Sequence, residues 1–545
     1  MTAPNAYASL YDGFRWSVPE RYNIGVDICD RHAAESPDRT AIIDIGPDGT
    51  AATTTFAMLR DASDRLANAL SATCDRGDRI GVLLPQCLET AVAHIAITKM
   101  GCIALPLFTL FGPEALLHRL ADSGATVVIT NAAGAETLGG LRDRLPALER
   151  VLCIDGATHG AEDYHAACAA ASPGFTPVDT AADDPAILIY TSGTTGAPKG
   201  ALHAHRVLLG HLPGVEMSHD FFPMEGDRIW TPADWAWIGG LLDVLMPALH
   251  HAVPVVACRF RKFTAQAAFD LIRDHGIRNA FLPPTALKLM RLETPDTPVP
   301  MRSVASGGET LGKELIAWGQ QVFGTTINEF YGQTECNMIV SSCAALAPAE
   351  PGVMGFAVPG HKVAVIDETD KRICAVNAEG SIAVRAPDPV MFLGYWNNPD
   401  ATAKKFVTVD GAEWLLTGDR GCTTPSGRIR FIGRDDDIIT SGGYRIGPAE
   451  IEDCLLTHPA VQMAGVVGKP DALRGEVVAA YIKLAADVPG SDTLAQEIAA
   501  HVKSRLAAYE YPRVIRFVDA MPMTTTGKII RADLRRMAMD ENDAT

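Results

Sequence analysis

The stretch Tyr190-Thr191-Ser192-Gly193-Thr194-Thr195-Gly196-Ala197-Pro198-Lys199-Gly200 decides the fold, because it joins a buried strand to a loop suited to an anion. Residues 186–189 are apolar and predict the strand. Glycines let the backbone approach a ligand closely, and exposed N–H groups form an anion-binding concavity. Threonine and serine hydroxyls add donors, and Lys199 adds a positive charge suited to a phosphate. The loop therefore predicts a polyphosphate site.

Two other interpretations of this loop fit its sequence less well. A Walker A loop needs Gly-Lys followed by Ser or Thr, whereas here Ala197 and Pro198 precede Lys199 and Gly200 follows it. A plain surface turn rich in glycine and threonine is the bland alternative. Eleven residues of this composition directly after a strand favour the phosphate loop.

Composition limits the classes of function. The 545 residues are too many for one hydrophobic core and predict at least two domains. A net charge of −18 argues against nucleic acid as the main partner. Twelve scattered cysteines without a CxxC pair, and a start without a signal-peptide pattern, predict a reduced, cytoplasmic protein. The apolar region 91–108 is interrupted by His94 and Lys99, so we expect core rather than stable membrane insertion.

The order of predicted elements gives the fold class. Strands and helices alternate over residues 56–131 and again over residues 253–330, which predicts mostly parallel sheets covered by helices. Ligands bind such sheets where strands end. The glycine, arginine and three aspartates at 433–437 predict a boundary. We expect an α/β chain with a large N-terminal domain of packed sheets, residues 1–433, and a small α+β C-terminal domain, residues 434–545.

The signature loop resembles that of the adenylate-forming enzymes: acyl-CoA synthetases, adenylation domains of peptide synthetases, and beetle luciferases. Tyr331-Gly332-Gln333-Thr334-Glu335 and Gly307-Gly308-Glu309-Thr310 resemble two further family motifs. The resemblance implies that the first motif holds the nucleotide and its metal, and that the second lines the adenine. Glu335 is the expected Mg²⁺ ligand, since Mg²⁺ uses one or two carboxylates plus substrate phosphates.

Three later motifs extend the resemblance from about residue 30 to 535. Thr417-Gly418-Asp419 and Arg434 resemble the ribose-binding residues, and Ser441 to Gly447 resembles the segment that lines the pantetheine channel of acyl-CoA synthetases, especially the medium-chain branch. The lysine that matches Lys528 bridges the carboxylate and the α-phosphate in the family. A positive charge there would offset the repulsion between two anions. The family's small domain acts as a mobile lid, and rotation is expected about Asp436.

The resemblance assigns roles to residues of this chain in three groups. Lys528, Thr334 and Lys199 are the expected catalytic residues, and Gly442, Gly443, Tyr444 and Arg445 are expected to contact CoA. The expected ATP-binding residues are Thr191, Ser192, Gly193, Thr194, Thr195, Gly196, Lys199, Gly308, Glu309, Thr310, Glu329, Phe330, Tyr331, Gly332, Gln333, Thr334, Asp419, Arg434 and Lys528.

The acyl pocket is predicted from three glycines and one aromatic wall. A tryptophan matches Gly332 in acetate-specialised relatives, and Trp237, Ile238, Gly239 and Gly307 are expected nearby. This pattern predicts room for a medium-chain acid, with a short branched or aryl acid as the alternative. The other possibility is that Gly239 and Gly307 serve backbone geometry while another side chain fills the space.

The sequence thus predicts an AMP-forming acyl-CoA synthetase that uses Mg²⁺, ATP, CoA and a carboxylic acid. A carrier-protein adenylation domain and a non-catalytic nucleotide-binding regulator are the rival functions. Homo-oligomerisation stays open, and no residue is singled out as a general base for the CoA thiol.

Overall fold

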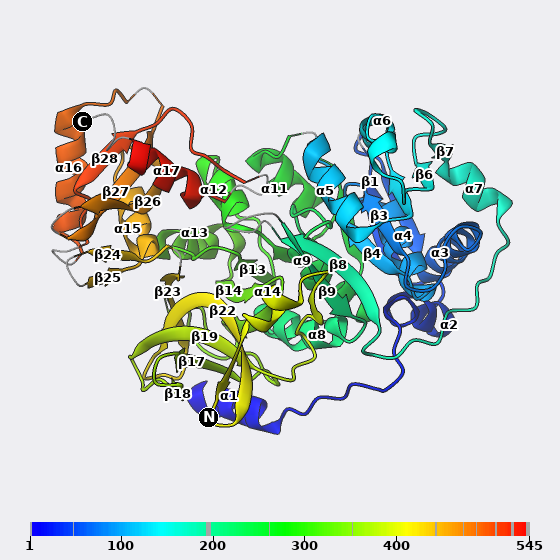
Figure 1. Ribbon diagram of the computed structural model, residues 1–545, viewed down its shortest axis with the longest axis horizontal. Helices are drawn as coiled ribbons and strands as arrows, with labels where there is room; N and C mark the ends of the chain where they lie inside the picture. The colour runs from blue at the N-terminus through cyan, green and yellow to red at the C-terminus, as the bar shows by residue number, and fades with distance from the viewer. Residues whose placement is uncertain are drawn as a thin grey trace. The chain divides into compact units, whose positions relative to one another are not determined.

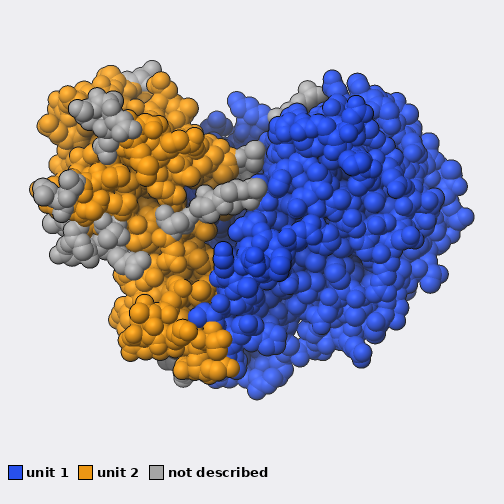
Figure 2. Space-filling model, viewed as in Figure 1, with its two compact units in different colours: residues 1–363, 384–407, 412–415 blue, residues 364–383, 408–411, 416–545 orange. Residues whose placement is uncertain are grey.

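The computed structural model describes residues 3–46, 48–191, 198–260, 262–350, 352–435, 437–441, 444–471, 474–486, 488–506, 510–524 and 528–540 (Figure 1). They form two compact units (Figure 2). The larger unit comprises residues 1–363, 384–407 and 412–415, and the smaller unit comprises residues 364–383, 408–411 and 416–545. The division predicted between residues 433 and 434 stays a prediction, and Asp436 lies outside the described residues.

The first sheet of the larger unit carries the strand before the signature loop. Its strand order is β20-β9-β8-β4-β3-β5-β6-β7. The strands are β3 Arg79–Leu83, β4 Ile103–Pro106, β5 Val127–Thr130, β6 Arg150–Cys153, β7 Glu162–Asp163, β8 Pro185–Thr191, β9 Lys199–Ala204 and β20 Gly394–Tyr395. Strands β3 to β8 pair in parallel, whereas β9 and β20 are antiparallel.

The second sheet of the larger unit has the order β16-β15-β14-β13-β12-β10-β11-β1-β2. Its centre is parallel and both edges are antiparallel. The strands are β1 Thr40–Ile45, β2 Ala51–Thr55, β10 Ile229–Trp230, β11 Val255–Cys258, β12 Asn279–Phe281, β13 Ser303–Gly307, β14 Ile327–Gln333, β15 Cys336–Ser341 and β16 Phe356–Ala357. The predicted α/β class with mostly parallel sheets is therefore confirmed.

Helices cover these sheets with apolar faces that the sequence spacing predicts. In α11, for example, the Thr264 side chain caps the first turn by accepting from the Ala267 N–H, and Phe269 and Ile272 are buried. The helices are α1 Ala3–Gly13, α2 Arg31–Glu35, α3 Phe56–Leu70, α4 Leu88–Lys99, α5 Pro113–Ser123, α6 Ala132–Gly139, α7 Tyr164–Ala170, α8 Val207–Ser218, α9 Ile238–Gly240, α10 Met246–His250, α11 Ala265–Asp274, α12 Pro284–Leu292, α13 Lys313–Phe323 and α14 Pro399–Ala403, with single turns η1 Val26–Asp30, η2 Arg142–Arg144 and η3 Leu241–Leu245.

The smaller unit contains most of a sheet of order β18-β17-β19-β22-β21, with β23 beside β22, and a second sheet of order β25-β24-β27-β26, with β28 beside β27. Its C-terminal part is α+β, as predicted. The elements are β17 Val363–Asp367, β18 Arg372–Ile373, β19 Glu379–Arg385, β21 Phe406–Val409, β22 Ala412–Thr423, β23 Ile429–Arg434, β24 Ile439–Ser441, β25 Tyr444–Ile446, α15 Pro448–Leu456, β26 Val461–Asp471, β27 Gly475–Leu484, α16 Asp492–Lys503, β28 Val514–Phe517 and α17 Arg531–Asp540.

A buried lysine ties three helical segments of the larger unit together. Lys99 at the end of α4 is fully buried, and its ammonium lies 2.5 Å from Asp30 Oδ1 and 2.8 Å from Asp64 Oδ1. Burial alone would lower the pKa of Lys99, but Cys29, Asp30 and Asp64 raise it overall. The charged lysine therefore neutralises carboxylates on η1 and α3 inside the core.

Replacing Lys99 by methionine should destabilise the larger unit by about 3 kcal/mol, because breaking a buried ion pair leaves carboxylates uncompensated. Differential scanning calorimetry measures the shift of the unfolding transition. Arg144→Met, which removes the exposed pair between Arg144 and Glu114, is the control and should cost less than about 1 kcal/mol. Equal shifts for the two variants would contradict the role given to Lys99.

Candidate active site

The predicted nucleotide residues of the larger unit follow parallel strands of the second sheet. Strands β10, β12, β13 and β14 are parallel neighbours, so their carboxyl ends share one edge. Gly307 at the end of β13 is paired with Phe330 in β14. The segment Gly308–Thr310 therefore leaves β13 beside the end of β14, where the motif that begins at Tyr331 lies, at the edge where such sheets bind ligands.

The adenine segment is held in place by Glu329. Gly308 has a φ of +99°, which favours glycine. The turn that follows is fixed because the Leu311 N–H donates to Glu329 Oε2 at 3.4 Å. Glu329 is buried, and its own N–H donates to Ser342 Oγ at 2.7 Å. Glu329 thus acts as a support for the predicted adenine segment.

The Tyr331–Glu335 motif forms the tip of a β-hairpin. Strand β14 continues through Gln333, which pairs with Cys336 at the start of the antiparallel β15. Thr334 and Glu335 make the turn between them. Lys405 Nζ donates to Gln333 Oε1 at 3.1 Å. A hairpin fixes its tip from both sides, so the side chains of Thr334 and Glu335 start from a well-defined backbone.

Glu335 is linked to the signature-loop lysine through Tyr395. The Glu335 side chain is buried and accepts a hydrogen bond from the Tyr395 hydroxyl. The Lys199 ammonium lies 4.7 Å from the centre of the Tyr395 ring, within cation–π range. One tyrosine side chain thus contacts a carboxylate from one sheet through its hydroxyl and a cation from the other sheet through its ring.

The backbone around Tyr395 reinforces this link. Phe392 N donates to the Glu335 carbonyl at 2.9 Å, while Leu393 N and Trp396 N donate to the carbonyls of Leu202 (2.6 Å) and Gly200 (2.7 Å) on β9. Residues 392–396 therefore bind the tip of the β14–β15 hairpin on one side and the strand after the signature loop on the other. We call this segment the Tyr395 strap.

The Glu335 environment fits a magnesium ion shared with phosphates. Within the described ranges no group of three or more His, Cys, Asp or Glu residues is arranged to hold a metal. One buried, hydrogen-bonded carboxylate, near a lysine predicted to bind phosphate, is instead compatible with Mg²⁺ when nucleotide phosphates and water complete its coordination. The residues present therefore fit Mg²⁺ bound together with ATP.

Several predicted residues lie outside the described part of the chain. These are Ser192, Gly193, Thr194, Thr195 and Gly196 of the signature loop, the predicted hinge Asp436, and Gly442 and Gly443 of the predicted CoA segment. The flanks of the two glycine-containing segments are described. Thr191 is paired with Lys199, and Ser441 is paired with Tyr444 across strands β24 and β25, the second of which also contains Arg445.

The smaller unit brings together the two predicted ribose residues. Asp419 in β22 is opposite Arg434 in β23, and Arg434 Nη1 lies 3.6 Å from Asp419 Oδ1. Gly418 has a φ of +79°, and its carbonyl accepts from the Asp435 N–H at 3.0 Å. The arginine is partly exposed and the aspartate is buried. This pairing presents a fixed carboxylate, which can accept two hydroxyl hydrogen bonds.

Lys528 is exposed and lies in the smaller unit. The Thr524 N–H donates to the Lys528 carbonyl at 2.7 Å, and the Lys528 N–H donates to Thr524 Oγ1 at 3.0 Å. Met523 and Ile529 also form a bridge. The backbone of the predicted catalytic lysine is therefore anchored on Thr524.

The room predicted beside the acyl-pocket glycines is occupied. A Cβ built at Gly307 would lie 2.5 Å from the Phe330 ring, and one at Gly239 would lie 2.9 Å from the Phe281 ring. A Cβ at Gly332 would lie 2.4 Å from the Met338 backbone nitrogen. The expectation of empty space at these positions was wrong: Gly239 and Gly307 accommodate aromatic rings, and Gly332 accommodates a close backbone approach. Trp237 remains near this region, 6.4 Å from Phe108 between ring centres.

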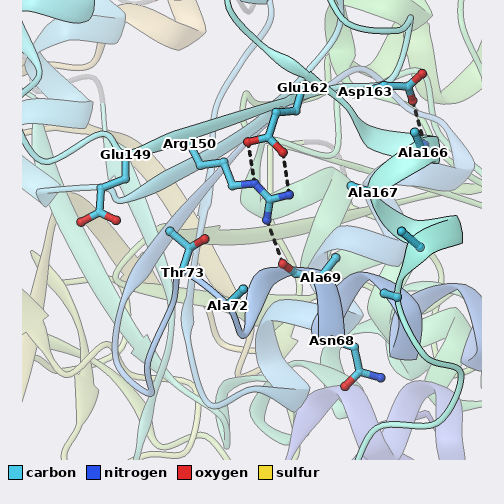
Figure 3. Close-up of a pocket in the computed structure, with 12 residues that line it drawn as sticks. Asn68, Ala69, Ala72, Thr73, Glu149, Arg150, Glu162, Asp163, Ala166 and Ala167 are labelled. Carbon is cyan, nitrogen blue, oxygen red and sulfur yellow. Dashed lines mark hydrogen bonds and ion pairs between the residues drawn. The ribbon is translucent and has the colours of Figure 1, made fainter.

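A hollow elsewhere in the larger unit does not fit the predicted chemistry. It has a volume of about 730 Å³, half of its lining residues are alanines, and it contains Arg150 and Glu162 (Figure 3). The guanidinium donates to both Glu162 oxygens, at 3.0 and 2.8 Å, and to the Ala69 carbonyl at 2.8 Å. Because the charge of Arg150 is already compensated, the strand-end region is the better candidate for an anionic ligand.

Comparison with known proteins identifies the family. The model of the AMP-binding enzyme family matches residues 29–396, and that of the AMP-binding enzyme C-terminal domain matches residues 450–528. The chain belongs to the AMP-binding enzyme family. The predicted resemblance to adenylate-forming enzymes is therefore confirmed.

The relatives of this AMP-binding enzyme include acyl-CoA synthetases. The human mitochondrial acyl-coenzyme A synthetase ACSM1 is 33% identical over 96% of this chain and 92% of its own. The crystal structure of a Brucella canis acyl-CoA synthetase is 35% identical, covers 98% of each chain and superposes with a TM-score of 0.73. The crystal structure of the anthranilate CoA ligase AuaEII with anthranoyl-AMP is 27% identical, covers 97% of this chain and 99% of its own, and superposes with a TM-score of 0.87.

Tyr395 is the site residue that sequence reasoning missed in this AMP-binding enzyme. The sequence marks Gly394-Tyr395-Trp396 only as a short strand or turn, since 59 positions separate Tyr395 from the motif's last residue, Glu335. Their contact arises only from tertiary structure. Among the described residues, no helix has both the length and the apolarity needed to cross a bilayer.

Tyr395→Phe should weaken magnesium-dependent ATP binding by about tenfold, because it keeps the ring beneath Lys199 but removes the hydroxyl that orients Glu335. Calorimetric titration of ATP at several Mg²⁺ concentrations measures the effect. Tyr7→Phe, which removes a hydroxyl bonded to the Ala357 carbonyl at 2.8 Å, is the matched control and should leave binding unchanged. An unaltered Mg²⁺ dependence in Tyr395→Phe would show that Glu335 needs no such support.

Proposed function

We propose that this AMP-binding enzyme is an AMP-forming acid–CoA ligase of class EC 6.2.1. It converts a carboxylic acid, ATP and CoA into acyl-CoA, AMP and pyrophosphate through an acyl-adenylate. The observation that carries the proposal is the contact of Glu335 and Lys199 on Tyr395, which brings a candidate Mg²⁺ ligand and a phosphate-binding cation to the same place.

In the first half-reaction an oxygen of the acid attacks the α-phosphorus of ATP, and pyrophosphate leaves. Lys199 and the signature loop hold the phosphates, and Thr334 on the hairpin tip is proposed to contact the α-phosphate. Mg²⁺ held by Glu335 neutralises phosphate charge when it is bound. Asp419 and Arg434 are proposed to hold the ribose. Lys528 is proposed to offset the repulsion between the two anions and to stabilise the transition state.

In the second half-reaction the CoA thiol attacks the acyl carbonyl carbon and AMP leaves. Gly442, Gly443, Tyr444 and Arg445 are proposed to contact the pantetheine arm. Their role, and that of Asp436 as the hinge between residues 1–433 and 434–545, is carried over from the family motifs. Successive glycines would let a flat backbone pass close to a narrow ligand.

The identity of the acid is a separate proposal. A medium-chain acid is supported by the similarity to acyl-CoA synthetases such as ACSM1, but no longer by empty space beside the three glycines. The aryl acid named for AuaEII keeps an aryl substrate as the alternative. A cytoplasmic location is proposed because the twelve cysteines, all in the described ranges, form no disulfide.

The alternative from another class is a nucleotide-binding regulator without turnover. Acid-dependent exchange of pyrophosphate into ATP separates the two functions, because exchange requires reversible acyl-adenylate formation. We expect exchange that depends on an added acid. If no acid in a broad panel supports exchange, the enzyme proposal is wrong and the nucleotide-binding regulator is the better explanation.

Lys528→Ala should slow acyl-adenylate formation by about 10² to 10³, since removing one positioned donor from a developing anion costs that much. Thioester formation from supplied acyl-adenylate should change little. Single-turnover assays of each half-reaction measure both rates. Lys503→Ala, at an exposed lysine whose ammonium lies 5.1 Å from the Tyr511 ring, is the control and should leave both rates unchanged. Equal loss of both half-reactions in Lys528→Ala would refute its assignment to adenylation alone.

Asp436→Pro should show the opposite pattern, because proline fixes φ near about −65° and blocks a hinge rotation. Pyrophosphate exchange should survive while CoA-thioester formation collapses. Asp436→Ala keeps the backbone free and should retain both activities. Normal thioester formation in the proline variant would place the hinge elsewhere.

A further inference from the structure

A buried carboxyl–amide pair lies between two segments assigned to the acyl pocket. Asp243 on η3 is 2% exposed, and Asn337 on β15 is 5% exposed. Asn337 Nδ2 donates to Asp243 Oδ1 at 2.7 Å. Neither residue belongs to the motifs that bind nucleotide or CoA.

The two remaining oxygens of this pair face the acyl-pocket glycines. A Cβ built at Gly332 would lie 2.6 Å from Asn337 Oδ1, and one at Gly239 would lie 3.6 Å from Asp243 Oδ2. The same position at Gly239 lies 2.9 Å from the Phe281 ring, whose centre is 5.2 Å from that of Phe330. The polar pair therefore lies beside the aromatic rings that occupy this region.

Neither of these oxygens has a hydrogen-bond partner among the residues that the structure describes. His211 is an ionisable neighbour, but its Nε2 is 3.9 Å from Asp243 Oδ1, too far for a hydrogen bond. Its Nδ1 donates to the Val207 carbonyl, so Nε2 carries no proton in the neutral ring. Buried polar side chains are normally hydrogen-bonded, so these two oxygens, beside the predicted acyl-pocket glycines, are available to a ligand or to water.

The chemistry of the two oxygens is complementary to a hydroxyl. Burial raises the pKa of Asp243 well above its usual range and so favours the protonated carboxyl, whose Oδ2–H can donate. Asn337 Oδ1 can only accept. A hydroxyl group donates one hydrogen bond and accepts another, whereas a methylene group does neither.

We propose that Asp243 and Asn337 are specificity-determining residues that select an acid whose acyl chain carries a hydroxyl group. This inference rests on the proposed function and narrows its substrate class. The substrate hydroxyl donates to Asn337 Oδ1 and accepts from Asp243 Oδ2–H. An unsubstituted acid leaves both groups buried and unpaired, and a site built to bond a hydroxyl rejects an analogue that lacks it.

The test compares matched acids in the pyrophosphate-exchange assay. Butyrate is set against the hydroxybutyrate isomers, and benzoate against the hydroxybenzoate isomers. In the wild-type enzyme, kcat/KM for one hydroxy acid should exceed that of its parent by about 10². In Asp243→Leu and in Asn337→Leu this ratio should fall to about one or below, while the parent acid is used as well as before or better.

Two further variants separate selection from folding. Asp243→Asn keeps a donor at the same place and should retain most of the preference. Asp388→Asn, which alters another buried carboxylate, 2.8 Å from His361, should leave the ratio unchanged. Circular dichroism shows whether the leucine variants fold. If they unfold, the inference is supported by loss of the preference for the hydroxy acid in Asn337→Asp or by its retention in Asp243→Asn.

Three results would overturn the inference. The first is that the parent acids are used as well as every hydroxy derivative. The second is that the enzyme prefers the amino derivative 4-aminobutyrate over the hydroxybutyrates. The third is that the leucine variants keep the wild-type ratio of kcat/KM between the hydroxy acid and its parent. In each case exchange still occurs, so the proposed function stands. Absence of exchange with all acids would instead overturn the proposed function itself.

Discussion

The hydrogen bond from Tyr395 to Glu335 is the interaction on which the candidate site depends. Glu335 lies on a hairpin of the second sheet, and Lys199 begins a strand of the first. The Tyr395 ring contacts both, and the strap around it hydrogen-bonds to both backbones. The two sheets share a hydrophobic core, and this link adds a polar contact that positions the two predicted phosphate-site groups relative to each other.

Each unit contains a buried charged group that an opposite charge holds in position: Lys99 lies beside two aspartates, and Asp419 lies beside Arg434. At the buried pair of Asp243 and Asn337, by contrast, Asp243 Oδ2 and Asn337 Oδ1 form no hydrogen bond with the described residues. Unpaired buried groups are costly, and functional sites are where such a cost is retained.

Much of this organisation could be predicted from sequence because it is local. The helix at α5 and the strand at β8 follow from apolar spacing, and the motif around Thr334 and Glu335 is contiguous. The acyl pocket could not be predicted in the same way. Whether a glycine borders empty space or a ring depends on side chains such as Phe281 and Phe330, which reach it only through tertiary packing. The role of Tyr395 was hidden for the same reason.

The fate of the acid oxygen tests the central claim most directly. An acid labelled with ¹⁸O in its carboxylate is incubated with ATP, Mg²⁺ and CoA, and the products are analysed by mass spectrometry. Attack of the carboxylate on the α-phosphorus, with the thiol then displacing AMP, leaves one labelled oxygen in AMP and none in pyrophosphate. Unlabelled AMP, or label in inorganic phosphate together with ADP, would contradict an acyl-adenylate route.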